Sequence, residues 1–493
     1  MRYVLALDQG TTGSTALIIA EDGSVVGRGY REITQHFPQP GWVEHDAEEI
    51  FARTMEAARE ALAAAKVVPE AIGITNQRET IVLWDRKTGR PLDKAIVWQD
   101  RRTTKRAQEL REAGQSEAIY QATGLVVDPY FSGTKLEWLL REKARGVAPE
   151  TLAAGTIDSW LIWKLTNGAV HATEHTNASR TMLYDINAHT WSDRLCALFN
   201  VPRGILPEVR ASSGDFGTAD AAHLGHAIPI RGVAGDQQAA LFGQGCWTSG
   251  LSKQTYGTGA FLLLHTGERR PAGGQGILTT VACGPRGEPQ YALEASIFIA
   301  GAAVQWLRDG LGIVGKAGET EAMARSLEGN DGVYFVPALT GLGAPHWEAD
   351  ARGTIVGLTR GTSREHLVRA ALEAMAYGTA DVLEAMRGAS GASLDVLRVD
   401  GGAAENDWLM QFQSDVLGVP VERPDLVETT ALGSAGLAGI AAGVWKDAAA
   451  FHASRRFSRF EPARGASVAR DGLPGWRRAV RAAVHWARDR EGA

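Results

Sequence analysis

Apolar runs separated by short polar turns open the chain and predict a meander of strands. Residues 3–7 form an apolar run that predicts a buried strand, and residues 15–20 predict a second strand after a turn at residues 8–13. A second turn at residues 21–24 leads into a third extended run at residues 25–30.

The pattern then changes to helical spacing. Apolar residues recur three or four positions apart between residues 51 and 62, which predicts an amphipathic helix. Asp46 precedes this helix and Glu49 follows three residues later, a spacing typical of a capping box. Apolar runs flanking the polar residues 76–79 predict further strands. Strands that alternate with helices favour an α/β fold.

The middle of the chain repeats the opening weakly. Residues 251–256 predict a strand, residues 257–259 a Gly/Thr turn and residues 260–265 another strand. We therefore predict two similar α/β domains that meet near residue 250, covering residues 1–250 and 251–493.

Two later segments predict helices of different kinds. Residues 429–445 contain no charged residue and are rich in Ala and Gly. This composition favours a buried, close-packed helix over a membrane span. The Arg-rich segment from about residue 463 predicts a solvated helix.

Composition narrows the class of protein. The 493 residues carry 51 Lys and Arg against 57 Asp and Glu, a net charge of −6 that argues against a nucleic-acid binder. The 3 cysteines are far apart and form no zinc or disulfide pattern. The first apolar run is too short for a signal peptide, so we expect a cytoplasmic protein without membrane association.

The first turn is a candidate phosphate site. Gly10 and Gly13 allow a tight turn whose backbone N–H groups, with the hydroxyls of Thr11 and Thr12, would hold phosphate oxygens. Asp8 at the end of the strand would hold Mg²⁺ through water. The alternative is an ordinary hairpin turn.

A second candidate follows the apolar segment 228–234. The carboxylate of Asp236, next to Gln237, is the kind of group that activates a hydroxyl by accepting its proton. The alternative is that Asp236 only caps the helix that begins there.

A third cluster has the composition of a polyol site. Arg78 would donate to adjacent hydroxyls and Glu79 would accept from them, while Trp98, Tyr130 and Phe261 would form an apolar wall. The alternatives are a surface ion pair of little energetic value and ordinary core aromatics.

Together these segments resemble the FGGY carbohydrate kinases, and within them the members that phosphorylate glycerol. The similarity runs from about Tyr3 to about Trp445. It is carried by Asp8-Gln-Gly-Thr-Thr12, Gly41-Trp-Val-Glu-His-Asp46, Gly73-Ile-Thr-Asn-Gln-Arg-Glu-Thr80, Asp128-Pro-Tyr-Phe-Ser-Gly-Thr-Lys135, Gly235-Asp-Gln-Gln-Ala-Ala-Leu-Phe-Gly243, Tyr256-Gly-Thr-Gly-Ala-Phe261, Gly341-Leu-Gly-Ala-Pro-His-Trp347 and Arg398-Val-Asp-Gly-Gly402.

The resemblance implies two ribonuclease-H-like domains of the actin/Hsp70 ATPase type, with the active site in the cleft between them. It implies that ATP and glycerol react, with Mg²⁺, to give sn-glycerol 3-phosphate and ADP. The N-terminal domain would hold glycerol, phosphate and Mg²⁺, and the C-terminal domain the nucleotide. A homodimer or homotetramer is also implied.

The same resemblance implies the roles of individual residues. Asp236 would be the general base and would serve the metal together with Asp8. The residues expected to contact glycerol are Arg78, Glu79, Trp98, Tyr130, Asp236, Gln237 and Phe261. The residues expected around the nucleotide and its phosphates are Thr11, Thr12, Gly13, Thr258, Gly301, Gln305, Gly402 and Asn406.

The chain departs from its relatives at two places. Some relatives have Ser and Arg where this chain has Gly13 and Thr15, so an Arg–phosphate contact is not expected here. The segment 225–227 lacks the Arg of an anion site for fructose 1,6-bisphosphate, because Ala227 stands there, which predicts weak inhibition or none.

Two alternative functions stay open from the sequence. The first is a kinase of the same family that acts on another polyol or on a ketose such as xylulose. The second is a nucleotide-dependent switch without catalytic activity, since actin and Hsp70 share the expected fold.

Overall fold

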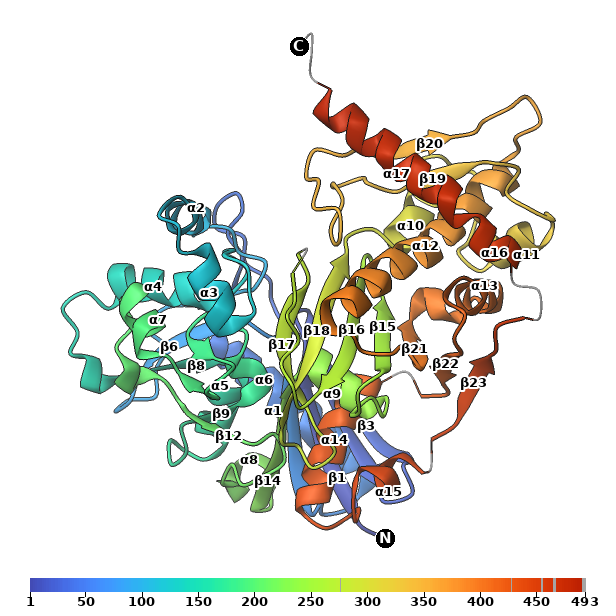
Figure 1. The fold of residues 1–493 in the computed structure, drawn as a ribbon. Coiled ribbons are helices and arrows are strands. Elements are labelled where there is room, and N and C mark those ends of the chain that lie inside the picture. Colours follow the sequence, from blue (N-terminus) through green and yellow to red (C-terminus); the bar gives the residue numbers. More distant parts are fainter. Residues whose placement is uncertain (275, 427, 454, 464–466, 490–493) are drawn as a thin grey trace.

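Two mixed β-sheets, one from each half of the chain, form the framework of the molecule (Figure 1). The computed structural model describes residues 1–274, 276–426, 428–453, 455–463 and 467–489. The first sheet contains, in spatial order, β13 (Thr218–Ala219), β14 (Ile228–Gly235), β5 (Ala71–Asn76), β1 (Tyr3–Gln9), β2 (Gly13–Ala20) and β3 (Val25–Glu32). The second contains β17 (Leu278–Cys283), β18 (Pro289–Ile297), β16 (Ala260–Gly267), β15 (Leu251–Tyr256), β21 (Val396–Gly401), β22 (Val421–Pro424) and β23 (Phe457–Phe460).

The two sheets share a topology. In the first, β1, β2 and β3 form an antiparallel meander, and β5 and β14 add in parallel beside β1. In the second, β15, β16 and β18 form the meander, and β21 and β22 add in parallel beside β15. The predicted strand–turn–strand repeat is therefore confirmed.

Smaller elements surround each sheet. The N-terminal lobe adds a four-stranded sheet of β4 (Glu44–His45), β7 (Ala95–Ile96), β6 (Ile81–Asp85) and β8 (Leu152–Thr156). Three of its helices pack in the core of the first sheet, namely α1 (Ala47–Ala65), α5 (Ile157–Leu165) and α8 (Ala221–Leu224). The others contribute to a second apolar core, namely α2 (Thr104–Glu112), α3 (Ser116–Thr123), α4 (Ser132–Lys143), α6 (His175–Ala178) and α7 (Asp193–Leu198). Short strands there are β9 (Ala172–Glu174), β10 (Tyr184–Asp185), β11 (Thr190–Trp191) and β12 (Glu208–Arg210). The C-terminal lobe adds α10 (Gly301–Asp309), α11 (Glu319–Arg325), β19 (Tyr334–Val336), β20 (Thr354–Val356), α12 (Arg364–Ser390), α13 (Asp407–Leu417), α15 (Ala448–His452), α16 (Ser467–Asp471) and α17 (Leu473–Arg488).

Two helices pack against each other next to both sheets. These are α9 (Asp236–Gly243) and α14 (Thr429–Ala441), and α14 also covers β1, β5 and β14 of the first sheet although it comes from the second half of the chain (Figure 1). The predicted buried helix is confirmed. Its approach to α9 depends on Gly433, where a Cβ atom would overlap the carbonyl oxygen of Ala239.

Gly433→Ala is therefore expected to destabilise the protein by roughly 1–3 kcal/mol, because α9 and α14 must separate to admit the methyl group. Gly388→Ala is the matched control. Gly388 also lies in a helix, but no atom lies within 4 Å of the position its Cβ would take. That variant is expected to gain roughly 0.5–1 kcal/mol from helix propensity. Urea unfolding midpoints test the pair, and equal shifts in both variants would contradict the role of the helix contact.

The structure corrects several local predictions. Strand β2 begins at Gly13 rather than at residue 15, and Asp8 lies inside β1 opposite Thr15, so the turn is shorter than expected. Asp46 caps α1 as predicted, but the reciprocal half of the capping box is not formed. The Glu49 carboxylate instead accepts from the backbone N–H and hydroxyl of Thr34.

The C-terminal prediction was also incomplete. Helix α17 is amphipathic, and one of its faces, which includes Trp476 and Val480, is buried in the core of the C-terminal lobe. Its Arg-rich face is the exposed one, so the charge pattern described only half of this helix. Within the described part of the chain, no helix has both the length and the apolar character needed to cross a membrane.

Candidate active site between the two lobes

Five of the residues predicted around the nucleotide line one cavity of about 590 Å³ in the C-terminal lobe. They are Thr258, Gly301, Gln305, Gly402 and Asn406. Thr258, Gly402 and Asn406 converge because β15 and β21 are parallel neighbours, so the turns that follow both strands lie at one edge of the sheet. Gly301 and Gln305 come from α10, whose first residue donates its backbone N–H to the carbonyl oxygen of Gly257 in the turn after β15. We call this space the C-lobe cavity. The sequence prediction missed Arg308, Thr320 and Glu321, which also line it.

Asn406 has a structural task in the C-lobe cavity as well. It is the N-cap of α13, where its Oδ1 accepts from the Leu409 N–H at 2.9 Å, and its Nδ2 lies 3.3 Å from the Thr320 hydroxyl. A substitution there would therefore affect both the helix and the cavity wall.

Three aromatic residues of the predicted polyol cluster line a second cavity of about 370 Å³. These are Trp98, Tyr130 and Phe261, and we call the space the aromatic cavity. The rings of Trp98 and Tyr130 meet edge to face with centroids 5.6 Å apart. The Trp98 indole N–H donates to the Thr11 hydroxyl at 2.9 Å, which joins this wall to the predicted phosphate turn.

Arg78 and Glu79 are buried, so the alternative of a surface ion pair is wrong. Arg78 donates to both carboxylate oxygens of Glu294, at 2.6 and 3.0 Å, and its Nε lies 3.1 Å from Asp236 Oδ1. Glu79 accepts from Arg180 Nε at 2.6 Å. Burial raises the pKa of Glu79, and the charges of Arg78 and Arg180 oppose that rise.

Arg180 and Glu294 were missed by the sequence prediction. Both are buried and both line the aromatic cavity, but they lie about 100 and 200 residues from Arg78 along the chain. Burial acts to raise the pKa of Glu294, and the charges of Arg180 and Arg78 outweigh it and bring that pKa down to about 2. No local motif marks either residue, because the role of each depends on the buried charges that it contacts in the folded protein.

Asp236 lies at the N-terminus of α9, and its side chain is about one third exposed. The helix N-cap is Gly235, so the interpretation of Asp236 as a cap is wrong. Burial raises the pKa of Asp236, although the nearby charge of Arg78 lowers it. The neighbouring Gln237 accepts a hydrogen bond from the buried Lys253 ammonium at 2.5 Å.

Asp8 faces Asp236 from the end of β1. Burial and the negative charge of Asp236 together raise the pKa of Asp8 to about 7. Two carboxylates that repel each other at the mouth of a phosphate turn are a donor set that suits a hard divalent cation. Among the described residues, no group of three or more His, Cys, Asp or Glu side chains is arranged to hold a metal ion.

The phosphate turn has little room beside Gly13. A Cβ atom there would lie 2.5 Å from the carbonyl oxygen of Arg31 and 2.7 Å from the Tyr30 hydroxyl. Thr11 is partly buried and Thr12 is exposed at the tip of the turn. Only a glycine therefore fits at the start of β2, and any contact from Gly13 to a ligand uses its backbone.

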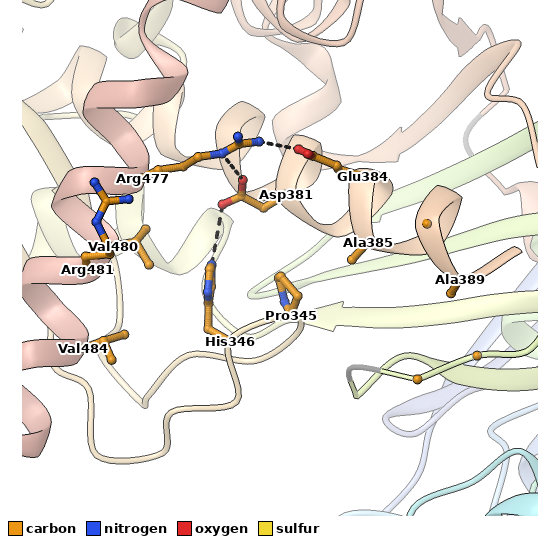
Figure 2. A pocket seen from close by; sticks show the side chains of 13 residues that line it. Pro345, His346, Asp381, Glu384, Ala385, Ala389, Arg477, Val480, Arg481 and Val484 are labelled. Atoms are coloured by element: carbon orange, nitrogen blue, oxygen red, sulfur yellow. Dashed lines mark hydrogen bonds and ion pairs between the residues drawn. The ribbon is translucent and has the colours of Figure 1, made fainter. Parts of the chain in front are cut away.

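A third and larger cavity, of about 780 Å³, lies between α12 and α17 (Figure 2). Several of its polar side chains pair with one another: Asp381 faces His346 at 3.6 Å and Arg477 at 3.5 Å, and Arg477 also pairs with Glu384. None of the residues predicted for the site lines this third cavity. Eight of them line the other two cavities, namely Thr258, Gly301, Gln305, Gly402 and Asn406 in the C-lobe cavity and Trp98, Tyr130 and Phe261 in the aromatic cavity. The remaining ones line none of the three: Asp8, Thr11, Thr12, Gly13, Arg78, Glu79, Asp236 and Gln237.

Both halves of the chain match models of one known protein family. The model of the FGGY family of carbohydrate kinases, N-terminal domain, matches residues 3–243, and the model of its C-terminal domain matches residues 253–442. The chain belongs to the FGGY family of carbohydrate kinases. The two matches together cover most of the chain and meet near the predicted domain boundary.

Individual relatives of this FGGY kinase are named as glycerol kinases. The glycerol kinase of Halorhodospira halophila is 53% identical over 500 residues, covering 100% of this chain and 98% of the relative. The glycerol kinase of Carboxydothermus hydrogenoformans is 54% identical over 497 residues, covering 98% and 99%. The crystal structure of Plasmodium falciparum glycerol kinase with ADP superposes with a TM-score of 0.93 at 35% identity, covering 98% of both chains. The predicted two-domain fold of the actin/Hsp70 type is therefore confirmed.

Proposed function

We propose that this FGGY kinase transfers the γ-phosphoryl group of ATP to a terminal hydroxyl of glycerol, giving sn-glycerol 3-phosphate and ADP. The observation that carries the proposal is the identity of 53–54% to glycerol kinases over essentially the whole chain. The solved relative with ADP supports a nucleotide as the co-substrate. In this proposal ATP occupies the C-lobe cavity, where Thr258, Gly301, Gln305, Gly402 and Asn406 surround it.

Glycerol would lie between the aromatic cavity and Asp236. The aromatic wall of Trp98, Tyr130 and Phe261 suits the carbon side of a small polyol. Arg78 and Glu79 supply a donor and an acceptor for adjacent hydroxyls, and Gln237 supplies an amide beside them. Because Arg78 and Glu79 are buried, a substrate that lacks a matching hydroxyl would leave them unpaired and would bind poorly.

Asp236 is the group we propose as the general base. It takes the proton of the attacking hydroxyl as the new oxygen–phosphorus bond forms, and the bond between the γ-phosphorus and the ADP oxygen breaks. Thr11, Thr12 and Gly13 line the turn that faces the phosphates from the N-terminal lobe. Phosphoryl transfer needs mainly positioning and charge neutralisation, which two facing turns supply.

Asp8 and Asp236 would hold Mg²⁺ between them. Burial, and after it the negative charge of Asp236, raise the pKa of Asp8, and both effects fit a site that a cation completes. Bound there, Mg²⁺ neutralises charge on the phosphate oxygens.

A panel of substrates tests the function. With ATP and Mg²⁺, ADP release is measured for glycerol, glyceraldehyde, dihydroxyacetone and xylulose. We expect glycerol to give the highest kcat/KM and to stimulate ATP turnover strongly. A preference for xylulose would assign the chain to another branch of the family, and ATP turnover that ignores every polyol would favour a nucleotide-dependent switch.

The assembly and location of the enzyme remain predictions. We propose a homodimer or homotetramer in the cytoplasm that acts on glycerol and ATP and needs neither a membrane nor a nucleic acid. Light scattering coupled to size-exclusion chromatography tests the oligomer, and a monomer at assay concentration would contradict it.

A further inference from the structure

Four buried charged side chains form a closed network at the proposed polyol site. Glu294 bridges two arginines, because its Oε1 accepts from Arg78 Nη2 at 3.0 Å and from Arg180 Nη2 at 3.1 Å, and its Oε2 accepts from Arg78 Nη1 at 2.6 Å. Arg180 in turn donates from its Nε to Glu79 Oε1 at 2.6 Å. The two positive charges thus balance the two negative ones.

The network joins the two halves of the molecule. Arg78 and Glu79 follow β5 of the first sheet, and Arg180 follows α6 in the same lobe. Glu294 comes from β18 of the second sheet, which lies between the lobes in Figure 1. The position of the polyol-binding pair therefore depends on a residue of the opposite sheet.

Burial makes these contacts specific. All four side chains are at most about 2% exposed, so none of them has water as a substitute partner. A buried charge that loses its partner carries a large desolvation penalty, and the surviving groups rearrange to avoid it. Each member thus fixes the rotamer of the next.

We propose that Glu294 and Arg180 are positioning residues for the polyol site, a role that rests on the proposed function of Arg78 and Glu79. Glu294 occupies both terminal nitrogens of Arg78, which directs the Nε edge of that guanidinium toward Asp236. Arg180 holds Oε1 of Glu79, which leaves Oε2 as the oxygen that accepts from a polyol hydroxyl. Neither positioning residue needs to touch the phosphate or the nucleotide.

Glu294→Gln tests this role because it keeps the shape and removes the charge. We expect the glycerol KM to rise at least tenfold while the ATP KM changes less than threefold. Glu294→Asp keeps the charge on a shorter side chain and should recover part of the loss. A glycerol KM within twofold of the wild-type value in Glu294→Gln would overturn the proposal.

Glu422→Gln is the matched control. Glu422 is also a buried glutamate of the second sheet with two arginine partners, Arg398 at 2.9 Å and Arg459 at 2.5 Å, but it lines neither of the two cavities of the site. The Glu422→Gln variant should have a lower Tm than the wild-type enzyme and an unchanged glycerol KM. Equal KM increases in both variants would show a general effect of lost stability and would also overturn the proposal.

A second route covers the case in which Glu294→Gln does not fold. Arg180→Lys keeps the positive charge but replaces the planar guanidinium, which donates to both Glu79 and Glu294, by a single ammonium group. The same tenfold rise in glycerol KM is therefore expected. An unchanged KM there contradicts the positioning role. Failure of the wild-type enzyme to use glycerol would instead count against the proposed function, and the same KM comparison would then be made with the substrate that the panel identifies.

Discussion

Asp236→Asn is expected to lower kcat by roughly 10²–10⁴-fold, the range that general base catalysis supplies. Asparagine keeps the size of the side chain but cannot accept the hydroxyl proton. The Tm should barely move, because Gly235 rather than Asp236 is the N-cap of α9 and the side chain is partly exposed. Arg78 keeps its pair with Glu294 when the charge at residue 236 is lost.

Two further measurements make this prediction specific. Asp193→Asn is the control, because Asp193 also begins a helix and pairs with an arginine, Arg203 at 2.5 Å, on the surface of the N-terminal lobe. It should leave kcat unchanged. Recovery of Asp236→Asn at saturating Mg²⁺ would assign the carboxylate to the metal alone. Near-normal turnover at the Mg²⁺ concentration used for the wild-type enzyme would place the base elsewhere, with Glu79 the first candidate.

Arg78→Lys is expected to raise the glycerol KM at least tenfold, an effect of about 1.4 kcal/mol or more, with little change in the ATP KM. Lysine keeps the charge but has one nitrogen, so it cannot bind both oxygens of Glu294 and face Asp236 at the same time. The polyol then loses an oriented donor.

Lysine is the better substitution because alanine would leave Glu294 buried with one guanidinium partner fewer, at a cost of roughly 3–5 kcal/mol in stability. Arg369→Lys serves as the control: Arg369 is buried and donates to Glu373 at 2.8 Å within α12. It should leave the glycerol KM within twofold of the wild-type value. Equal losses for glycerol and ATP in Arg78→Lys would indicate that Arg78 acts mainly on the fold.

Much of the fold follows from local patterns in the sequence. The strand meanders at both openings, the cap of α1 by Asp46 and the buried helix α14 were all predicted, because alternation, capping and small-residue content are local signals. The predictions were wrong where contacts between residues far apart in the sequence determine the local structure. The Glu49 carboxylate accepts a hydrogen bond from the Thr34 hydroxyl and does not complete the capping box. One face of α17 is buried, although the charges of this helix suggest that it is solvated.

The candidate site likewise contains residues that were predicted before the structure and residues that only the structure revealed. The aromatic wall was predicted from residue types in the sequence, and five residues of the C-lobe cavity were predicted from the resemblance to the FGGY family. The partners of Arg78 and Glu79 could not be predicted, since Glu294 and Arg180 carry no motif. Tertiary structure alone decided that these charges are buried together, and pairing then becomes obligatory because no water remains to solvate them.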